Sequence, residues 1–355
     1  MSSLYYTFED THCVCLVLPG LFAAEAVGPL VAETPYLCRC LSHCSNMNSN
    51  SGTFESVILN WFNGQSRVLE NSAGLLGYQL DGYKVQADET VLRVDPVFQQ
   101  MDINHAILAD QSVLDLDQAE ASAIIETINQ HFVSDGLQFT AGGPMRWYCK
   151  FRANLDLSTR PLSHAIGRDV ARESPTGPDA AVWRRWLAEI EMLLYSHPVN
   201  QKRQKHGEAL VNSLWLWGEG NLPSISVPVT GNAAVFGDHF YTRSVAHRYQ
   251  VPMQNIEQFS SIAADSSVLI VDDQLQSAAA TANESLRIER LNKLEQMVFK
   301  PLWNNLKRAH WKSARIWVGG DRWLQFDAKT RWQFWRRKKL LSEYLVHPES
   351  LNDNG

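Results

Sequence analysis

The chain has 355 residues, of which 45% are hydrophobic and 20% are charged, and its formal net charge is −6. This composition is typical of a folded globular protein, and the net negative charge gives no reason to expect nucleic acid or an anionic membrane as a partner. No apolar run reaches the roughly 18 residues needed to span a membrane, and residues 1–10 lack the pattern of a secretion signal. We therefore expect a soluble, cytoplasmic protein.

Apolar segments with strand or helix period follow one another through the first half of the chain. The expected strands are short and bounded by turn residues: 13–18, 86–94, 106–109, 137–140 and 146–151. Helical period is present in 21–31, and Asp117 with Glu120 forms a capping-box pattern at the start of a second helix. The stretch 42–53 is rich in Ser, Asn and Gly, which predicts a loop.

The second half of the chain has stronger signals of regular structure. Asp179 begins a helix that should end at His197, because the residue before a proline disfavours the helical conformation. Further elements are expected as follows: strands at 214–217 and 268–271, a helix at 286–306, and a hairpin formed by 315–318 and 322–326. Strands that alternate with helices predict an α/β fold with a largely parallel central sheet, flanking helices and added hairpins.

The densest run of large and conformationally specific residues extends from Asn212 to Gly220, and we call it the Trp segment. Trp215 and Trp217 alternate with leucines, so a strand period places both indoles on one face. Gly218 and Gly220 then allow positive φ and a close approach of the backbone. One interpretation is a core strand that ends in a loop. The other is a ligand crevice at the carboxyl end of a sheet strand, where open α/β folds bind ligands.

On the second interpretation, the candidate ligand-binding residues are those of this Trp segment and two charged residues farther along: Asn212, Trp215, Trp217, Gly218, Glu219, Gly220, Asp238 and Arg243. For Asp238 and Arg243 the alternative is a surface ion pair. A hydrolase triad is not expected, because no G-x-S-x-G motif surrounds a serine. The basic and aromatic stretch 331–339 is expected to pack its tryptophans on the core rather than to bind nucleic acid.

The cysteines gather near the start of the chain. Five of the six fall within the first 44 residues: Cys13, Cys15, Cys38, Cys40 and Cys44. Their thiolates could bind zinc or Cu(I), although the C-x-C pairs lack the C-x-x-C step of common zinc sites. The alternative is a set of structural thiols, because the cysteines in 13–18 and 36–41 alternate as residues on one face of a strand do. Disulfides are not expected in a reducing compartment.

Several motifs together resemble a known family. They are the segments 95–97, 131–132, 146–148, 189–200 and 212–220. In this order they resemble a bacterial family of phosphoglycerate mutase-like proteins, named as regulatory proteins of the RpfE type. The resemblance implies an alkaline phosphatase-like α/β fold and a distant relationship to the cofactor-independent phosphoglycerate mutases. We accordingly expect a single domain over 1–340, divergent over residues 1–94 and family-like over residues 95–340, followed by a polar tail over 341–355.

Those mutases share a Trp-x-Trp-Gly-x-Gly element, which the Trp segment matches. They also hold two divalent metals with aspartates and histidines and use a serine nucleophile. The first strand, which should end in a metal-binding aspartate, ends here in Pro19-Gly20. The later metal-binding stretch has Asp272 and Asp273 and lacks the expected histidine. These two carboxylates could hold one Mg²⁺, or they could simply end a strand.

The resemblance and its departures suggest a diverged, noncatalytic mutase-like protein without a cofactor. Its expected role is regulatory, through a small anionic ligand or a protein partner. One alternative is an active phosphoglycerate mutase or another phosphoryl-transfer enzyme, with a divalent metal at Asp272 and Asp273. Another is a metal-binding protein that uses the N-terminal cysteines.

Overall fold

The structure is a computed structural model that describes residues 12–23, 33–48, 52–63, 72–86, 88–101, 105–152, 155–222, 232–262, 266–280, 283–329, 341 and 344. None of its helices within these ranges is long and apolar enough to cross a membrane. Most of the expected helix over 21–31, the stretch 331–339 and nearly all of the expected tail over 341–355 lie outside the described residues.

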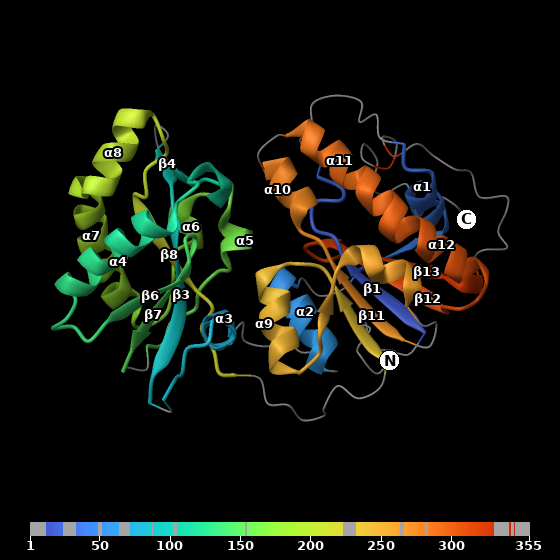
Figure 1. The fold of residues 1–355 in the computed structure, drawn as a ribbon, viewed down its shortest axis with the longest axis horizontal. Coiled ribbons are helices and arrows are strands. Elements are labelled where there is room, and N and C mark those ends of the chain that lie inside the picture. The colour runs from blue at the N-terminus through green and yellow to red at the C-terminus, as the bar shows by residue number, and fades with distance from the viewer. Residues whose placement is uncertain are drawn as a thin grey trace. The chain divides into compact units, whose positions relative to one another are not determined.

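The chain folds into two compact units (Figure 1). Unit 1 comprises Met1–Leu69 and Ser224–Gly355, and unit 2 is the intervening segment Glu70–Pro223. This differs from the single domain expected over 1–340. Each unit has its own sheet and its own hydrophobic cluster. The period of a strand reports which of its residues are buried, and it does not report which sheet the strand joins.

Unit 1 is built on a seven-stranded sheet with the order β10-β9-β11-β1-β12-β13-β2. Its strands are β1 (Cys13–Val17), β2 (Ser45–Asn48), β9 (Ala233–Phe236), β10 (Met253–Gln254), β11 (Ser267–Val271), β12 (Ser313–Gly319) and β13 (Arg322–Asp327). The five strands from β10 to β12 in this order are parallel, and β13 and β2 add antiparallel pairs at one edge. The largely parallel α/β sheet and the β12–β13 hairpin are therefore confirmed.

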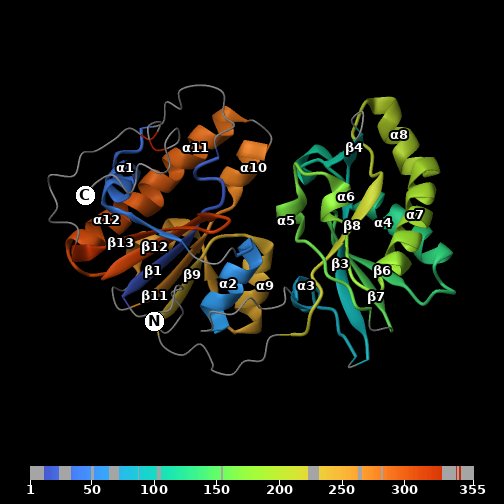
Figure 2. The same ribbon diagram turned by 180° about the vertical axis from the view of Figure 1, so that it is seen from behind.

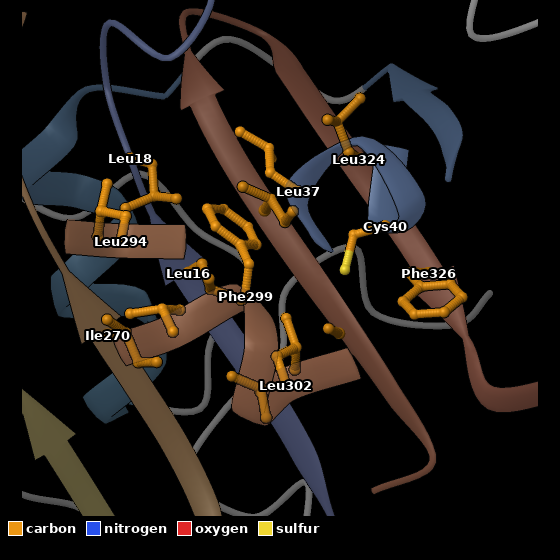
Figure 3. Close-up of a cluster of buried hydrophobic side chains, with 14 of the residues drawn as sticks. Leu16, Leu18, Leu37, Cys40, Ile270, Leu294, Phe299, Leu302, Leu324 and Phe326 are labelled. Atoms are coloured by element: carbon orange, nitrogen blue, oxygen red, sulfur yellow. The ribbon is translucent and has the colours of Figure 1, made fainter. Parts of the chain in front are cut away.

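Helices cover both faces of this sheet (Figure 2). They are α1 (Pro35–His43), α2 (Phe54–Asn63), α9 (Phe240–Arg248), α10 (Gln274–Ala280), α11 (Glu284–Leu294) and α12 (Lys300–Lys307). A π-helical turn, Glu295–Phe299, joins α11 to α12, so the expected helix over 286–306 is confirmed with an irregular centre. Figure 3 shows Phe299 of this turn among Leu16, Ile270 and Leu302, in the main core of the unit.

Unit 2 is built on a four-stranded antiparallel sheet with the order β6-β7-β3-β8. Its strands, with a separate β4–β5 ribbon, are β3 (Thr90–Val97), β4 (Gln99–Met101), β5 (Ala106–Leu108), β6 (Gln138–Gly143), β7 (Arg146–Phe151) and β8 (Ser213–Trp217). Its helices are α3 (Ala73–Leu80), α4 (Gln118–His131), α5 (Leu162–Ala165), α6 (Val170–Glu173), α7 (Ala180–Ser196) and α8 (Pro198–His206).

The long helices α4 and α7 pack on one face of the unit 2 sheet (Figure 1). Helix α4 begins with the expected capping box: the Asp117 side chain accepts from the Glu120 backbone, and the Glu120 side chain accepts from the Asp117 backbone. Helix α7 ends at Ser196, before His197, as expected. The hairpin formed by β6 and β7 is also confirmed.

The segment around Cys38 and Cys40 was assigned wrongly. It forms helix α1, where Leu37, Cys40 and Leu41 are buried at the spacing of one helical face. Over six residues, a helical stripe and a strand alternation share too many positions to be separated by period alone. The expected loop over 42–53 is also corrected, because it contains the end of α1 and the strand β2.

Candidate functional site

Ser213–Trp217 of the Trp segment form β8, an edge strand of the unit 2 sheet. Its neighbour β3 runs antiparallel, so β8 does not belong to the parallel kind of sheet in which such crevices are typical. The predicted division of faces is present: Leu214 and Leu216 belong to the cluster under α4 and α7, and the indoles of Trp215 and Trp217 share the opposite face. Both indoles are buried.

Trp217 belongs to a buried ionic cluster on this second face. Its Nε1 donates to Oδ2 of Asp95 at 2.7 Å, and Arg93 binds Oδ1 of Asp95 through Nε at 3.0 Å and Nη2 at 2.5 Å. The Arg93 guanidinium lies 5.2 Å from the Trp217 ring centre and 5.5 Å from that of Tyr148. Sequence reasoning missed Arg93. Its signal was a charged residue two positions before Asp95 within an otherwise apolar strand.

The residues around the two indoles also make internal contacts. The Asn212 amide accepts from the Gln99 backbone N–H and donates to the Gln99 carbonyl, both at 2.8 Å. Gly218 has φ +82° and accepts from the backbone of Gly74 at 3.0 Å. An added Cβ at Gly218 would lie 2.8 Å from that same nitrogen. Gly218 is therefore required by close packing against α3.

Two residues of the Trp segment form hydrogen bonds with the backbone of Thr159 and Arg160. Trp215 donates from Nε1 to the Arg160 carbonyl at 2.9 Å, and Glu219 accepts from the backbone N–H of Thr159 at 2.8 Å. Hydrogen bonds of this kind, which are partly shielded from solvent, fix the position of the backbone. These two predicted binding residues thus act as supports for the 159–160 backbone.

Arg160 is one of three basic side chains gathered around Glu173, and we call these four residues the Glu173 cluster. Arg160 Nε lies 4.0 Å, His164 Nε2 3.7 Å and Arg168 Nη1 3.6 Å from a Glu173 carboxylate oxygen. The side chain of Glu173 is 14% exposed, and those of Arg160 and Arg168 are 63% and 54% exposed. One carboxylate therefore faces two permanent positive charges and a titratable one, and the basic groups reach solvent.

The backbone beneath the Glu173 cluster is also held from the other side. The Leu108 backbone of β5 donates to the Arg168 carbonyl at 3.1 Å and accepts from Gly167 at 2.8 Å. Burial lowers the pKa of His164, and the neighbouring Arg168 adds to this shift. The cluster presents a positive surface on a fixed backbone, which suits binding of a phosphate or carboxylate. Sequence reasoning missed it because the three basic residues show no motif.

The remaining predicted ligand residues belong to unit 1. Arg243 Nη2 donates to the Asp238 carbonyl at 3.3 Å, within the turn that precedes and begins α9. The expected side-chain ion pair between them is not among the contacts of the described residues. The structure therefore divides the predicted set between two units, with Asp238 and Arg243 in one and the Trp segment in the other.

The carboxyl ends of the parallel strands in unit 1 are where the family resemblance implies metal ions. Asp272, directly after β11, is buried; its Oδ2 accepts from Arg290 and its Oδ1 from the Gln274 backbone. Asp273 Oδ2 lies 3.5 Å from Nε2 of His239. Burial raises the pKa of Asp272, while Arg290 opposes that rise.

The residues at this edge do not fit the implied pair of metals. An added Cβ at Gly20, after β1, would lie 2.6 Å from the backbone of Gln276, so the first turn of α10 closes that strand end. Across the described parts of the chain, no group of three or more His, Cys, Asp and Glu side chains is placed to hold a metal. Arg290 supplies Asp272 with the positive charge that a cation would otherwise provide.

The N-terminal cysteines lie on different elements and different faces. Val14 and Leu16 of β1 belong to the core cluster that contains Cys40 and Cys44, so Cys13 and Cys15 point to the opposite face of the sheet. Burial raises the pKa of the Cys40 thiol well above its usual value. None of the six cysteines, all of which lie within the described residues, forms a disulfide. This arrangement corresponds to structural thiols and does not bring the five candidate metal ligands together.

An open hollow of about 600 Å³ also lies on unit 2, between α4 and β6. Ile125 and Phe139 contribute apolar surface, and Glu126 is its charged residue. It contains no member of the Trp segment or of the Glu173 cluster.

Residues 81–200 match the family model of 2,3-bisphosphoglycerate-independent phosphoglycerate mutase. The chain is 32% identical over 127 residues to such a mutase from Methanothermobacter thermautotrophicus, covering 34% of this chain and 31% of the relative. It is 25% identical over 147 residues to the mutase from Methanosarcina mazei, and this alignment covers 41% of this chain and 36% of that relative. The aligned segment thus spans about a third of each relative. The chain is a distant relative of this mutase family.

A solved structure shares the fold over nearly the whole chain. The PH0037 protein from Pyrococcus horikoshii matches with a TM-score of 0.53 and 14% identity, over 97% of each chain. This likeness supports the mixed α/β fold alone. The family match covers Asp95 and the Glu173 cluster, whereas the Trp segment lies beyond its last residue.

Proposed function

We propose that this protein binds a small phosphorylated or carboxylated anion through the Glu173 cluster and does not transfer phosphoryl groups. The observation behind the proposal is the excess of positive charge around Glu173, where Arg160 and Arg168 are both within 4.0 Å of one carboxylate. Guanidinium groups suit such ligands because they donate paired hydrogen bonds to phosphate and carboxylate oxygens. The cluster also lies within the segment that resembles phosphoglycerate mutases.

The noncatalytic aspect of the proposal is supported by the ion pair of Asp272 and Arg290. Moving a phosphoryl group requires positive charge next to the transferred oxygens and an activated nucleophile. Here the buried carboxylate at the strand end is already neutralised by an arginine of its own unit. A regulatory role, a protein partner, a bacterial origin and the RpfE type remain predictions from the sequence.

The test is isothermal titration of the full chain with 3-phosphoglycerate. The double variant R160Q/R168Q should weaken binding about tenfold or more, because both charge-assisted contacts are lost. The control is R184Q, which removes an exposed arginine from α7 in the same unit. Equal affinities for the wild type and R160Q/R168Q would remove the Glu173 cluster as the binding site.

Activity separates the noncatalytic proposal from the enzyme alternative. The purified protein should not interconvert phosphoglycerates in the presence of Mn²⁺ or Mg²⁺. Interconversion that is abolished by a chelator would overturn the noncatalytic proposal and leave the binding site to be judged by the titration. Elemental analysis of the same preparation addresses the cysteine alternative, which requires bound zinc or copper.

A further inference from the structure

Helix α11 carries an arginine where its pattern calls for an apolar residue. Its buried positions are Arg287, Leu291 and Leu294, which follow the spacing of a single helical face. The two leucines belong to the core cluster of unit 1, together with Leu18, the residue that follows β1. Arg287 is only 2% exposed and continues this stripe toward the start of the helix.

One nitrogen of the buried Arg287 guanidinium lacks a hydrogen-bond acceptor. Its Nη2 has no hydrogen-bond partner among the residues that the structure describes. Burial lowers the pKa of Arg287, and the one carboxylate that opposes this shift is Glu284, at the exposed first turn of the helix. A buried N–H donor that has no acceptor is unfavourable, and more so when it belongs to a charged group. The position therefore calls for an acceptor that the described chain does not provide.

Arg290, three residues farther along, also has an unused donor. Its Nη2 donates to Asp272, and its Nε is buried with no partner within the described ranges. Residues three apart on a helix are neighbours on its surface, so the Arg287 and Arg290 side chains start from adjacent turns. Asp272 directly follows β11 and binds Arg290, so Arg290 lies at the carboxyl edge of the parallel strands, where open α/β sheets bind ligands.

We propose that Arg287 and Arg290 form a binding site for a compact oxyanion, such as inorganic phosphate or the phosphate group of a larger ligand. Such an anion would accept from the two unpartnered N–H groups. Three carboxylates bound the site: Asp272 and Asp273 at the strand end and Glu284 on the helix. Their negative charges oppose anion binding, so the anion must contact the arginines directly to bind.

This site is separate from the Glu173 cluster, which belongs to unit 2. The experiment therefore uses the full chain in the R160Q/R168Q background, where the proposed unit 2 site is removed. Inorganic phosphate is the probe, and both its dissociation constant and the midpoint of thermal unfolding are measured. Phosphate should bind and raise the unfolding midpoint in this background, because a ligand that binds only the folded state stabilises it.

Adding Arg287→Met should raise the dissociation constant about tenfold or more, since one charged donor is lost. The same change should leave the midpoint in phosphate-free buffer unchanged or higher, because an apolar side chain suits the buried stripe. An arginine with a purely structural role would instead lower that midpoint when replaced. The control is Arg308→Met, at the exposed end of α12, which should retain the full phosphate response.

Two results would overturn the proposal. One is the absence of phosphate binding in the R160Q/R168Q background. The other is a phosphate response that Arg287→Met leaves intact. Neither result bears on the Glu173 cluster, which is judged by 3-phosphoglycerate binding to chains that retain Arg287.

Discussion

Arg290 of α11 donates from Nη2 to Oδ2 of Asp272, so the buried carboxylate at the end of β11 is neutralised by a residue of its own unit. The two residues are 18 positions apart in sequence. Their pairing provides in the folded chain the positive charge that a metal ion supplies in a phosphoryl-transfer site.

Replacing Arg290 with Met should destabilise the fold by about 3 to 5 kcal/mol, because Asp272 is left as a buried charge without its partner. Asp272→Asn combined with Arg290→Met should recover much of that loss, since the amide oxygen can still accept from the Gln274 backbone. Urea unfolding of the two variants measures the difference. If the single variant is as stable as the wild type, the ion pair does not neutralise Asp272.

Trp217→Phe should lower the free energy of unfolding by roughly 1 to 3 kcal/mol. The change removes the indole N–H that donates to the buried carboxylate of Asp95 and keeps an aromatic ring beside Arg93. The matched control is Trp186→Phe, whose indole N–H has no partner among the described residues. Chemical unfolding should therefore show a clearly smaller loss for the control. Equal losses would mean that ring volume, and not the hydrogen bond, sets the effect.

Gly218→Ala should destabilise unit 2 more than Gly207→Ala does. Both glycines have positive φ, +82° and +72°, so both substitutions incur backbone strain of about 1 kcal/mol. Only at Gly218 would the new Cβ also meet neighbouring backbone, 2.8 Å from the nitrogen of Gly74, while nothing lies within 4 Å at Gly207. Thermal unfolding of the two variants measures this difference. Matching midpoints would show that α3 moves away at little cost.

Anion binding at the Glu173 cluster should strengthen as the pH falls. Burial lowers the pKa of His164 below its usual 6.5. The side chain is therefore mostly neutral at pH 7 and gains its positive charge as the pH falls below 6.5. Sulfate is the probe, because its own charge is constant over this range. His164→Gln should abolish the rise in sulfate affinity between pH 7 and pH 5. A rise that survives in this variant would assign the pH dependence to another group.

The same shift predicts how His164 affects stability without an anion. A lowered pKa means that the unfolded chain binds the proton more readily than the folded chain does. The contribution of His164 to the free energy of unfolding therefore falls as the pH drops below 6.5. The loss is complete only below the pKa of the folded state. Urea unfolding across this window should show a steeper decline for the wild type than for His164→Gln.

Local patterns in the sequence predicted much of the regular structure. The alternation of Trp215 and Trp217 with leucines placed the indoles on one face of β8, and Asp117 with Glu120 located the start of α4. The largely parallel sheet was also expected from alternating strands and helices. These features were predictable because periods of two and 3.6 residues and capping hydrogen bonds depend on neighbours within one or two turns.

Assignments without such local support were wrong or absent. The segment 36–41 was expected to be a strand and forms α1, because its buried positions fit both periods over so short a length. The basic residues of the Glu173 cluster were not selected, since isolated arginines and histidines are common on protein surfaces. These residues come together only because they surround the same carboxylate, that of Glu173, and no spacing in the sequence predicts that contact.

The sequence by itself determined which faces of the strands and helices are apolar, and hence the fold class. Only the tertiary structure decided that the chain divides into two units. It also decided that Trp217 donates a hydrogen bond to Asp95, 122 positions away, and that Arg290 pairs with Asp272. The physical reason is that burial of apolar surface depends on residue type and spacing along an element. The partner of a buried charge is set by which elements pack together, and that choice is made only when the whole chain folds.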